Sequence, residues 1–331
     1  MLRRMFGAAA MAAVCLAGVL GGLTPAFAGL GQPTDGQMGL QLPATQLMEQ
    51  LITLYDVVNL VIIAIALFVL FLMLYVMYRF SEKKNPTPSR TTHNVVLEVA
   101  WTVIPILILA GISIPSFRLL YDQYSFPKPD ITVKAVANAW YWDHEYLDSK
   151  FTVSSNYVSD EDVLKQKMGD DPFAEKYGAL EGIERSKALY QDAAAVWAER
   201  SQLRKLTVDN DIALPVNKVV HLLVTSNDVI HSWTIPSFGV KMQAVPGRTA
   251  ALWFKPDKVG TFHGQCSVLC GKLHSAMPIT VRVVEQAVYD QWVAALTAKD
   301  RKKANEILKA DAERSKANPA VAQVETTQSQ P

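Results

Sequence analysis

Two long apolar runs stand near the start of the chain. Residues 57–78 are almost wholly apolar, and residues 95–120 form a second run that Pro105 and Pro115 interrupt. Each run is long enough for an α-helix that crosses a bilayer, which needs about 20 residues, and membrane helices tolerate proline. A buried core helix would explain either run alone, but two adjacent runs favour the membrane. We therefore predict a transmembrane helical hairpin over residues 47–126.

The loop between the two runs is basic. It carries Arg79, Lys83, Lys84 and Arg90 against Glu82 alone. Because basic residues accumulate on the cytoplasmic side of membrane proteins, the loop is expected to face the cytoplasm. The remainder of the chain then lies outside the cytoplasm.

The first residues have the pattern of an export signal. Two arginines precede an apolar, small-residue run over residues 5–23, and Ala-Phe-Ala at 26–28 resembles a cleavage site. An uncleaved membrane helix is the alternative, which the glycine and alanine content disfavours. We predict that residues 1–28 are a cleaved signal peptide and that residues 29–46 are an exposed lead-in.

Beyond Pro127 the pattern changes to short alternating segments separated by glycine and proline. Such segments predict an antiparallel β-sandwich or barrel. Residues 159–205 break the alternation, because they are rich in Ala, Glu, Lys and Asp, and we expect a helical insertion there. The predicted strands are 131–137, 140–146, 206–209, 218–226, 249–255, 260–265 and 278–284.

The C-terminal region follows the last predicted strand. Residues 285–298 have the spacing of a short amphipathic helix, and from Lys299 onward the chain is charged, then polar, and ends in proline. Such a composition is typical of disorder. The β-domain is therefore expected over residues 127–285, and residues 286–331 as a short helix with a disordered tail.

Charge and cysteine content narrow the choice of function. The 331 residues carry a formal net charge of +1 and no basic stripe, which argues against nucleic acid as a partner. Of the three cysteines, Cys15 lies inside the predicted signal. The mature chain would keep only Cys266 and Cys270.

These two cysteines belong to a dense group of soft metal ligands. Cys266, Cys270, His274 and Met277 follow one another at spacings of four, four and three. Thiolate, thioether and imidazole together favour copper, and a single blue-type copper would need only one thiolate. Two thiolates can bridge a pair of copper ions, and His231 is the candidate for the second imidazole.

Two other readings of the cysteine pair remain open. An exported compartment is oxidising, so Cys266 and Cys270 could form a disulfide. A structural zinc site could use both cysteines with His231 and His274. Neither reading gives Met277 a role, so the residue types favour copper.

Two residues outside this group also suggest function. Trp140 opens a Trp-Tyr-Trp strand, and an indole near a copper site would be a point of electron transfer, although most strand aromatics only pack. Glu98 sits in the first turns of the second apolar run. A carboxylate there either reaches headgroup water or faces a partner or a proton path.

Taken in order, these features resemble subunit II of the cytochrome c oxidase family. The resemblance rests on the signal, the hairpin and the motifs W-Y-W, D-V-I-H-S-W, A-V-P-G-R and C-x3-C-x3-H-x2-M. It covers roughly residues 47–146 and 206–284, and leaves out the insertion and the tail. The combined pattern is highly specific, although each piece alone is not.

The resemblance implies an all-β, cupredoxin-like Greek-key barrel that holds the dinuclear copper centre CuA. Cys266 and Cys270 would bridge the two coppers, and the remaining ligands would be His231, His274, Met277 and the main-chain carbonyl of Val268. Trp140 matches the tryptophan that receives electrons from cytochrome c. Glu98 matches the carboxylate at the mouth of a proton-uptake path.

The resemblance also implies a role and partners. The chain would be a subunit of a terminal oxidase in the bacterial inner membrane, with its C-terminal domain on the periplasmic side. It would pass electrons to haem in subunit I, where oxygen is reduced and protons are translocated, and subunit III would be a further partner besides membrane lipid. Asp143, Glu145 and Asp148 could steer a basic cytochrome c by charge.

Two departures from the family pattern concern magnesium. Val268 stands where the family usually has Glu, and Gln243 where it usually has Asp. Magnesium prefers oxygen ligands, often carboxylate, so weak or absent magnesium binding is expected at the subunit interface. A CuA-containing nitric oxide reductase and a membrane-anchored zinc module are the alternative functions.

Overall fold

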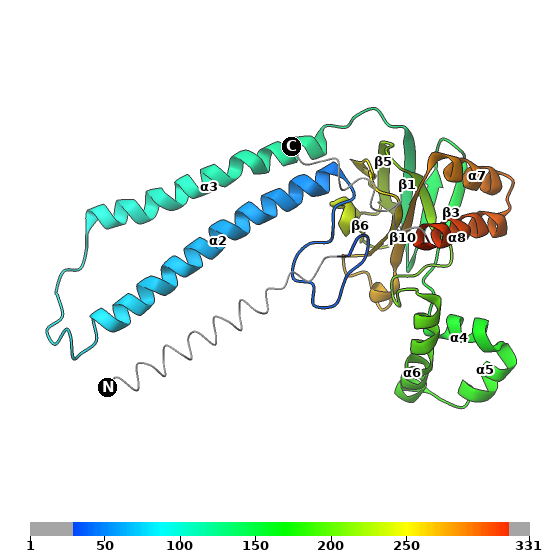
Figure 1. The fold of residues 1–331 in the computed structure, drawn as a ribbon, viewed down its shortest axis with the longest axis horizontal. Helices are drawn as coiled ribbons and strands as arrows, with labels where there is room; N and C mark the ends of the chain where they lie inside the picture. Colours follow the sequence, from blue (N-terminus) through cyan, green and yellow to red (C-terminus); the bar gives the residue numbers. More distant parts are fainter. Residues whose placement is uncertain (1–28, 318–331) are drawn as a thin grey trace. The chain divides into compact units, whose positions relative to one another are not determined.

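The computed structural model describes residues 29–317, so the predicted signal peptide lies outside the described residues. The described chain divides into two compact units (Figure 1). One unit is residues 46–127, and the other combines residues 29–45 with everything from 128 onward.

The smaller unit is a pair of long helices. Helix α2 spans Gln46–Arg79 and helix α3 spans Val95–Tyr124, and the two lie side by side (Figure 1). Both are long and apolar enough to cross a membrane, and none of their most apolar stretches is buried within the chain. Asn94 begins α3, because its side-chain oxygen accepts hydrogen bonds from the main-chain N–H groups of Val96 and Leu97. The predicted helical hairpin is confirmed.

The larger unit is built on three sheets. A five-stranded sheet has the order β3-β2-β1-β5-β8, a three-stranded sheet has the order β4-β10-β9, and β6 pairs with β7. The strands are β1 (Ile131–Asn138), β2 (Tyr141–Tyr146), β3 (Phe151–Ser155), β4 (Ile212–Pro215), β5 (Val220–Ser226), β6 (His231–Ile235), β7 (Val240–Ala244), β8 (Ala250–Phe254), β9 (Gly260–Gln265) and β10 (Pro278–Val284).

Strand alternation places one apolar face of each sheet inside. Along β5, Val220, Leu222 and Val224 are buried while the residues between them are half-buried, as the period of two requires. Strand β1 pairs antiparallel with β2 and parallel with β5. Trp140 lies just beyond β1, at the end of that strand where Ala137 pairs with Ser226.

The predicted insertion is a separate group of three helices, α4 (Asp160–Met168), α5 (Asp170–Tyr177) and α6 (Gly182–Arg200), gathered to one side of the sheets (Figure 1). A capping box between Ser159 and Asp162 begins α4. The helices enclose a core of their own, which includes Val163, Tyr177 and Trp197. The insertion is therefore helical, as expected.

The C-terminal region differs from its prediction. Helix α7 spans Gln286–Thr297, and a second helix, α8, spans Arg301–Ala317 where a disordered tail was expected. Ala304 and Leu308 face the main core and are almost fully buried. This four-residue apolar spacing marks one face of a helix. The many charged residues around Ala304 and Leu308 are typical of a disordered tail, but these two apolar residues share one helix face that packs on the core.

Candidate metal centre

The fold brings the predicted soft ligands together at one end of the β-domain. The sulfur atoms of Cys266 and Cys270 lie 3.7 Å apart. The Nδ1 atom of His231 lies 3.9 Å from the Cys266 sulfur, and that of His274 lies 3.5 Å from the Cys270 sulfur. The ligand atoms of His231, Cys266 and Cys270 all fall within 4.8 Å of one another, a spacing at which they could hold a metal ion.

The loop between β9 and β10 is shaped by its own main chain. Pairing of Gln265 with Pro278 closes the loop, and the main-chain N–H of Cys266 donates to the carbonyl of Met277 at 3.0 Å. His274 opens a short 3₁₀-helix, η2 (His274–Ala276), after a turn. These bonds hold both cysteines and His274 on the same side of the loop.

The group is shielded from water. Cys266, Cys270 and His231 are buried, and Met277 is 1% exposed. The main-chain oxygen of Val268 lies 3.2 Å from the Cys266 sulfur, so this carbonyl also faces the group. Soft donors in a dry enclosure fit copper better than a hard cation.

The two thiols differ in their readiness to ionise. Burial raises the pKa of Cys266, but hydrogen bonds from His231 and from nearby main chain outweigh burial and lower it. Burial and the charge of Cys266 raise the pKa of Cys270. The first thiolate therefore opposes ionisation of the second thiol, and a bound cation would offset that charge. The donor set fits a metal that takes two thiolates.

A carboxylate that the sequence analysis missed supports His231. The Oδ1 atom of Asp228 lies 2.8 Å from His231 Nε2, while Nδ1 of the same ring faces the sulfur atoms. Burial raises the pKa of the Asp228 carboxyl, but hydrogen bonds from His231 and from the N–H groups of Val229 and Ala139 hold that pKa below its usual range. The signal available was the D-x-x-H spacing within D-V-I-H-S-W.

The predicted electron-transfer tryptophan reaches the same loop. The Trp140 indole N–H donates to the main-chain oxygen of Cys270 at 3.0 Å. Gly271 permits this approach, since its φ is +119° and an added Cβ would lie 3.0 Å from the indole ring. The main-chain N–H of Ala139 is held by Asp228 at 2.5 Å. Trp140 is thereby fixed directly against the group.

The carboxylates of β2 and its turn are held by local partners. Asp143 accepts hydrogen bonds from Ser154 and Asn138. Glu145 forms an ion pair with Lys134 at 3.1 Å. Asp148 accepts from a main-chain N–H on β1. Of these three carboxylates, only Glu145 forms an ion pair within the described part of the chain.

Glu98 lies in the helical unit, in the first turn of α3. Its carboxylate accepts a hydrogen bond from the main-chain N–H of Asn94 at 3.3 Å, which satisfies one of the free N–H groups at the start of α3. Gln243 is exposed on β7, opposite Ser232 on β6. It is therefore close in the sheet to His231.

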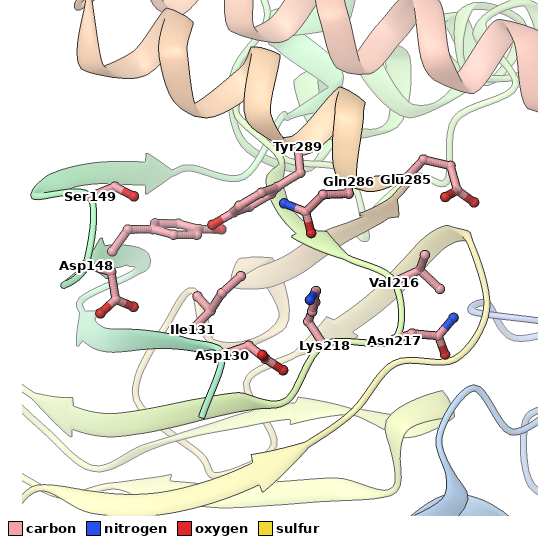
Figure 2. A pocket seen from close by; sticks show the side chains of 11 residues that line it. Asp130, Ile131, Asp148, Ser149, Val216, Asn217, Lys218, Glu285, Gln286 and Tyr289 are labelled. Carbon is pink, nitrogen blue, oxygen red and sulfur yellow. The ribbon is translucent and has the colours of Figure 1, made fainter. Parts of the chain in front are cut away.

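A cavity of about 660 Å³ opens at the other end of β1 and β2, beneath α7 (Figure 2). Asp130, Asp148, Lys218 and Tyr289 point toward it from four different segments. None of the predicted metal ligands lines this cavity, although Asp148, a predicted steering residue, does. It is distinct from the metal group.

Comparison with known proteins places the chain in a family. The model of the cytochrome c oxidase subunit II transmembrane domain matches residues 33–119, and that of the subunit II periplasmic domain matches residues 186–284. Cytochrome c oxidase subunit 2 of Cereibacter sphaeroides is 40% identical over 264 residues, which cover 80% of this chain and 82% of that protein. The chain belongs to the cytochrome c oxidase subunit II family.

Two further proteins of this family are similar to the chain. Probable cytochrome c oxidase subunit 2 of Rickettsia bellii is 37% identical over 274 residues, which cover 82% of this chain and 89% of that protein. The crystal structure of the periplasmic domain of cytochrome oxidase subunit II of Bradyrhizobium japonicum shares 37% identity. It covers 53% of this chain and 99% of that chain, with a TM-score of 0.39.

Membership confirms the main expectations. A cytochrome c oxidase subunit II is the electron-transfer subunit of a haem-copper terminal oxidase, and its family carries the CuA centre. Two apolar helices anchor it in a membrane, its β-domain is periplasmic, and it assembles with subunit I. These findings favour the oxidase over a nitric oxide reductase and over a structural zinc module.

Proposed function

We propose that this subunit takes single electrons from a c-type cytochrome at Trp140 and passes them to haem in subunit I. There oxygen is reduced to water while protons are translocated across the bacterial inner membrane, and subunit III completes the complex. The observation that carries this proposal is the pair of sulfur atoms 3.7 Å apart, each next to one imidazole. Two adjacent thiolates are suited to bridging two soft ions.

The residues present fit a dinuclear copper centre. Cys266 and Cys270 would supply the shared thiolates, and the terminal donors would be His231, His274, Met277 and the carbonyl oxygen of Val268. When bound, the copper pair supplies a one-electron redox change spread over two metal atoms. Neither a disulfide nor a tetrahedral zinc site would need the buried thioether of Met277.

The chain's own residues keep the donor atoms in place. Asp228 lies against Nε2 of His231, and by accepting a hydrogen bond from a proton-bearing Nε2 it would leave Nδ1 of the neutral ring unprotonated and facing the sulfur atoms. Burial of both cysteines excludes water from the donor set. With copper bound, such a dry enclosure would limit movement of the donor atoms, which would favour fast electron transfer.

Trp140 offers a direct connection from the metal group to the protein surface. Its indole is half-buried, so part of the ring meets solvent, and its N–H bonds directly to the main chain of Cys270. Replacement by phenylalanine removes that hydrogen bond and shrinks the ring. We expect Trp140→Phe to slow electron acceptance from cytochrome c while copper content and visible spectrum stay unchanged.

Trp253→Phe on β8 is the matched control, since it changes the same residue type at a half-buried strand position away from the metal loop. If both variants accept electrons at the wild-type rate, Trp140 is not the point of electron transfer. If Trp140→Phe also loses copper, the residue acts on the metal centre instead.

Two further parts of the proposal concern protons and magnesium. Glu98 would stand at the mouth of a proton path into subunit I, near the start of α3. Val268 and Gln243 lack the carboxylates that magnesium favours, so this interface would hold magnesium weakly or not at all. Elemental analysis of the purified complex tests this, and stoichiometric magnesium at that interface would contradict it.

A further inference from the structure

The surface around Trp140 is formed by two exposed loops. One precedes β6 and the other is the loop of the metal group itself. Nearly half of their exposed side chains are apolar, and Leu269 between the two cysteines is 81% exposed. The exposed apolar residues of the two loops are Val229, Ile230, Leu269 and Leu273. Apolar side chains clustered on a periplasmic surface mark a contact site for another protein.

A single cation stands over the indole of Trp140. The Lys272 ammonium lies 6.0 Å from the ring centroid, and the residue is exposed. Lys272 makes no ion pair with any residue in the part of the chain that the structure describes. Its charge is therefore presented to whatever touches Trp140.

The carboxylates near Trp140 have hydrogen-bond or ion-pair partners within the chain. Asp228 is surrounded by four donors, the N–H groups of Ala139 and Val229, the Ser226 hydroxyl and the His231 ring. These four hydrogen bonds fix the position of the Asp228 side chain in the loop before β6. On β2, Glu145 is offset by a lysine of β1. The hydrogen bonds to Asp228 leave it negatively charged, with 35% of its side chain exposed, and Lys272 supplies the positive charge over the indole ring.

We propose that Lys272 selects the electron donor, favouring a one-electron carrier whose contact face is apolar at its centre and carries a carboxylate opposite Lys272. A donor with a lysine-rich contact face meets a like charge at the point of closest approach, which slows docking there. This inference rests on the proposed role of Trp140. It adds an opposing charge to the expectation that Asp143, Glu145 and Asp148 steer a basic cytochrome c.

The test is a charge series at position 272 in the complete oxidase complex. Lys272→Met and Lys272→Glu are compared with wild type, using one basic and one acidic c-type cytochrome as probes. Lys255→Glu is the matched control, because Lys255 is exposed just beyond β8, at the opposite end of the large sheet from Trp140. The readouts are the second-order rate of donor oxidation at several ionic strengths and the copper content.

With the basic donor at low salt, the rate of donor oxidation should rise from wild type through Lys272→Met to Lys272→Glu, by on the order of tenfold for Lys272→Glu. With the acidic donor, the rate should fall in the same order. The difference should fade at high salt, because exposed charges are screened. Lys255→Glu should change either rate much less than Lys272→Glu does.

The inference is overturned if Lys272→Glu and Lys255→Glu give the same rates, or if both donors respond in the same direction. Failure of the proposed function looks different. In that case the copper-loaded wild-type complex would accept electrons from neither donor, or Trp140→Phe would have no effect.

Discussion

Asp228 should control how firmly the metal group binds copper. In Asp228→Asn the side chain keeps its shape, but an amide N–H₂ group competes for the place of one carboxylate oxygen. If that group faces His231, it favours a bare Nε2 and a proton on Nδ1. The atom that faces Cys266 and Cys270 would then carry a proton and could not bind metal.

The expected size follows from the position of the carboxylate. Loss of a partner that orients a metal-binding histidine typically costs about 10–100-fold in metal affinity, and each tenfold is about 1.4 kcal/mol. The Asp228 side chain is 35% exposed, so water can replace part of the lost interaction. We expect the lower end, about tenfold weaker copper binding.

The assay is a copper titration of the full chain in detergent against a competing chelator, with circular dichroism to check folding. Asp143→Asn is the matched control, because Asp143 also accepts two side-chain hydrogen bonds but contacts no candidate ligand. An Asp228→Asn chain that is folded and binds copper within twofold of Asp143→Asn would refute the reasoning.

Two further predictions concern stability of the metal-free chain. Burial raises the pKa of Asp211 to about 6, although Arg282 opposes the shift. As the pH rises, the unfolded chain therefore loses this proton before the folded chain does. The free energy of unfolding should fall by at most about 3 kcal/mol between pH 4 and 6. Asp211→Asn should show a smaller fall in melting temperature over that range, and an unchanged fall would contradict this. Leu308→Ala on α8 should cost about 2–4 kcal/mol, because the side chain is 3% exposed. Exposed Lys309→Ala should leave the melting temperature unchanged, and equal effects of the two would mean that α8 is not docked.

Features encoded by local pattern could be predicted from the sequence. The two membrane helices follow from their long apolar runs, and six of the ten strands that the structure describes follow from alternation bounded by glycine and proline. Residues 206–209, also predicted as a strand, belong to none of the strands. Cys266, Cys270 and His274 share one loop, so their short spacing alone suggested a common site. His231 lies far from them in the sequence, and the residues alone left it only a candidate. The family resemblance supported it.

Features that depend on contacts between distant segments could not be predicted. The Asp228 carboxylate bonds both the main-chain N–H of Ala139 and the ring of His231. The hydrophobic pattern of the sequence contains no signal for such a link between segments. Lys272 reaches Trp140 only because the metal loop folds over the end of β1. Helix α8 contains few apolar residues, and their burial depends on the core that it meets.

Copper stoichiometry and electron paramagnetic resonance of the purified full chain bear most directly on the metal centre. The account predicts two coppers per chain, with one unpaired electron coupled equally to both nuclei, and loss of this signal in both Cys266→Ser and Cys270→Ser. A single copper, a colourless zinc, or a Cys266–Cys270 disulfide that takes up no metal would contradict it.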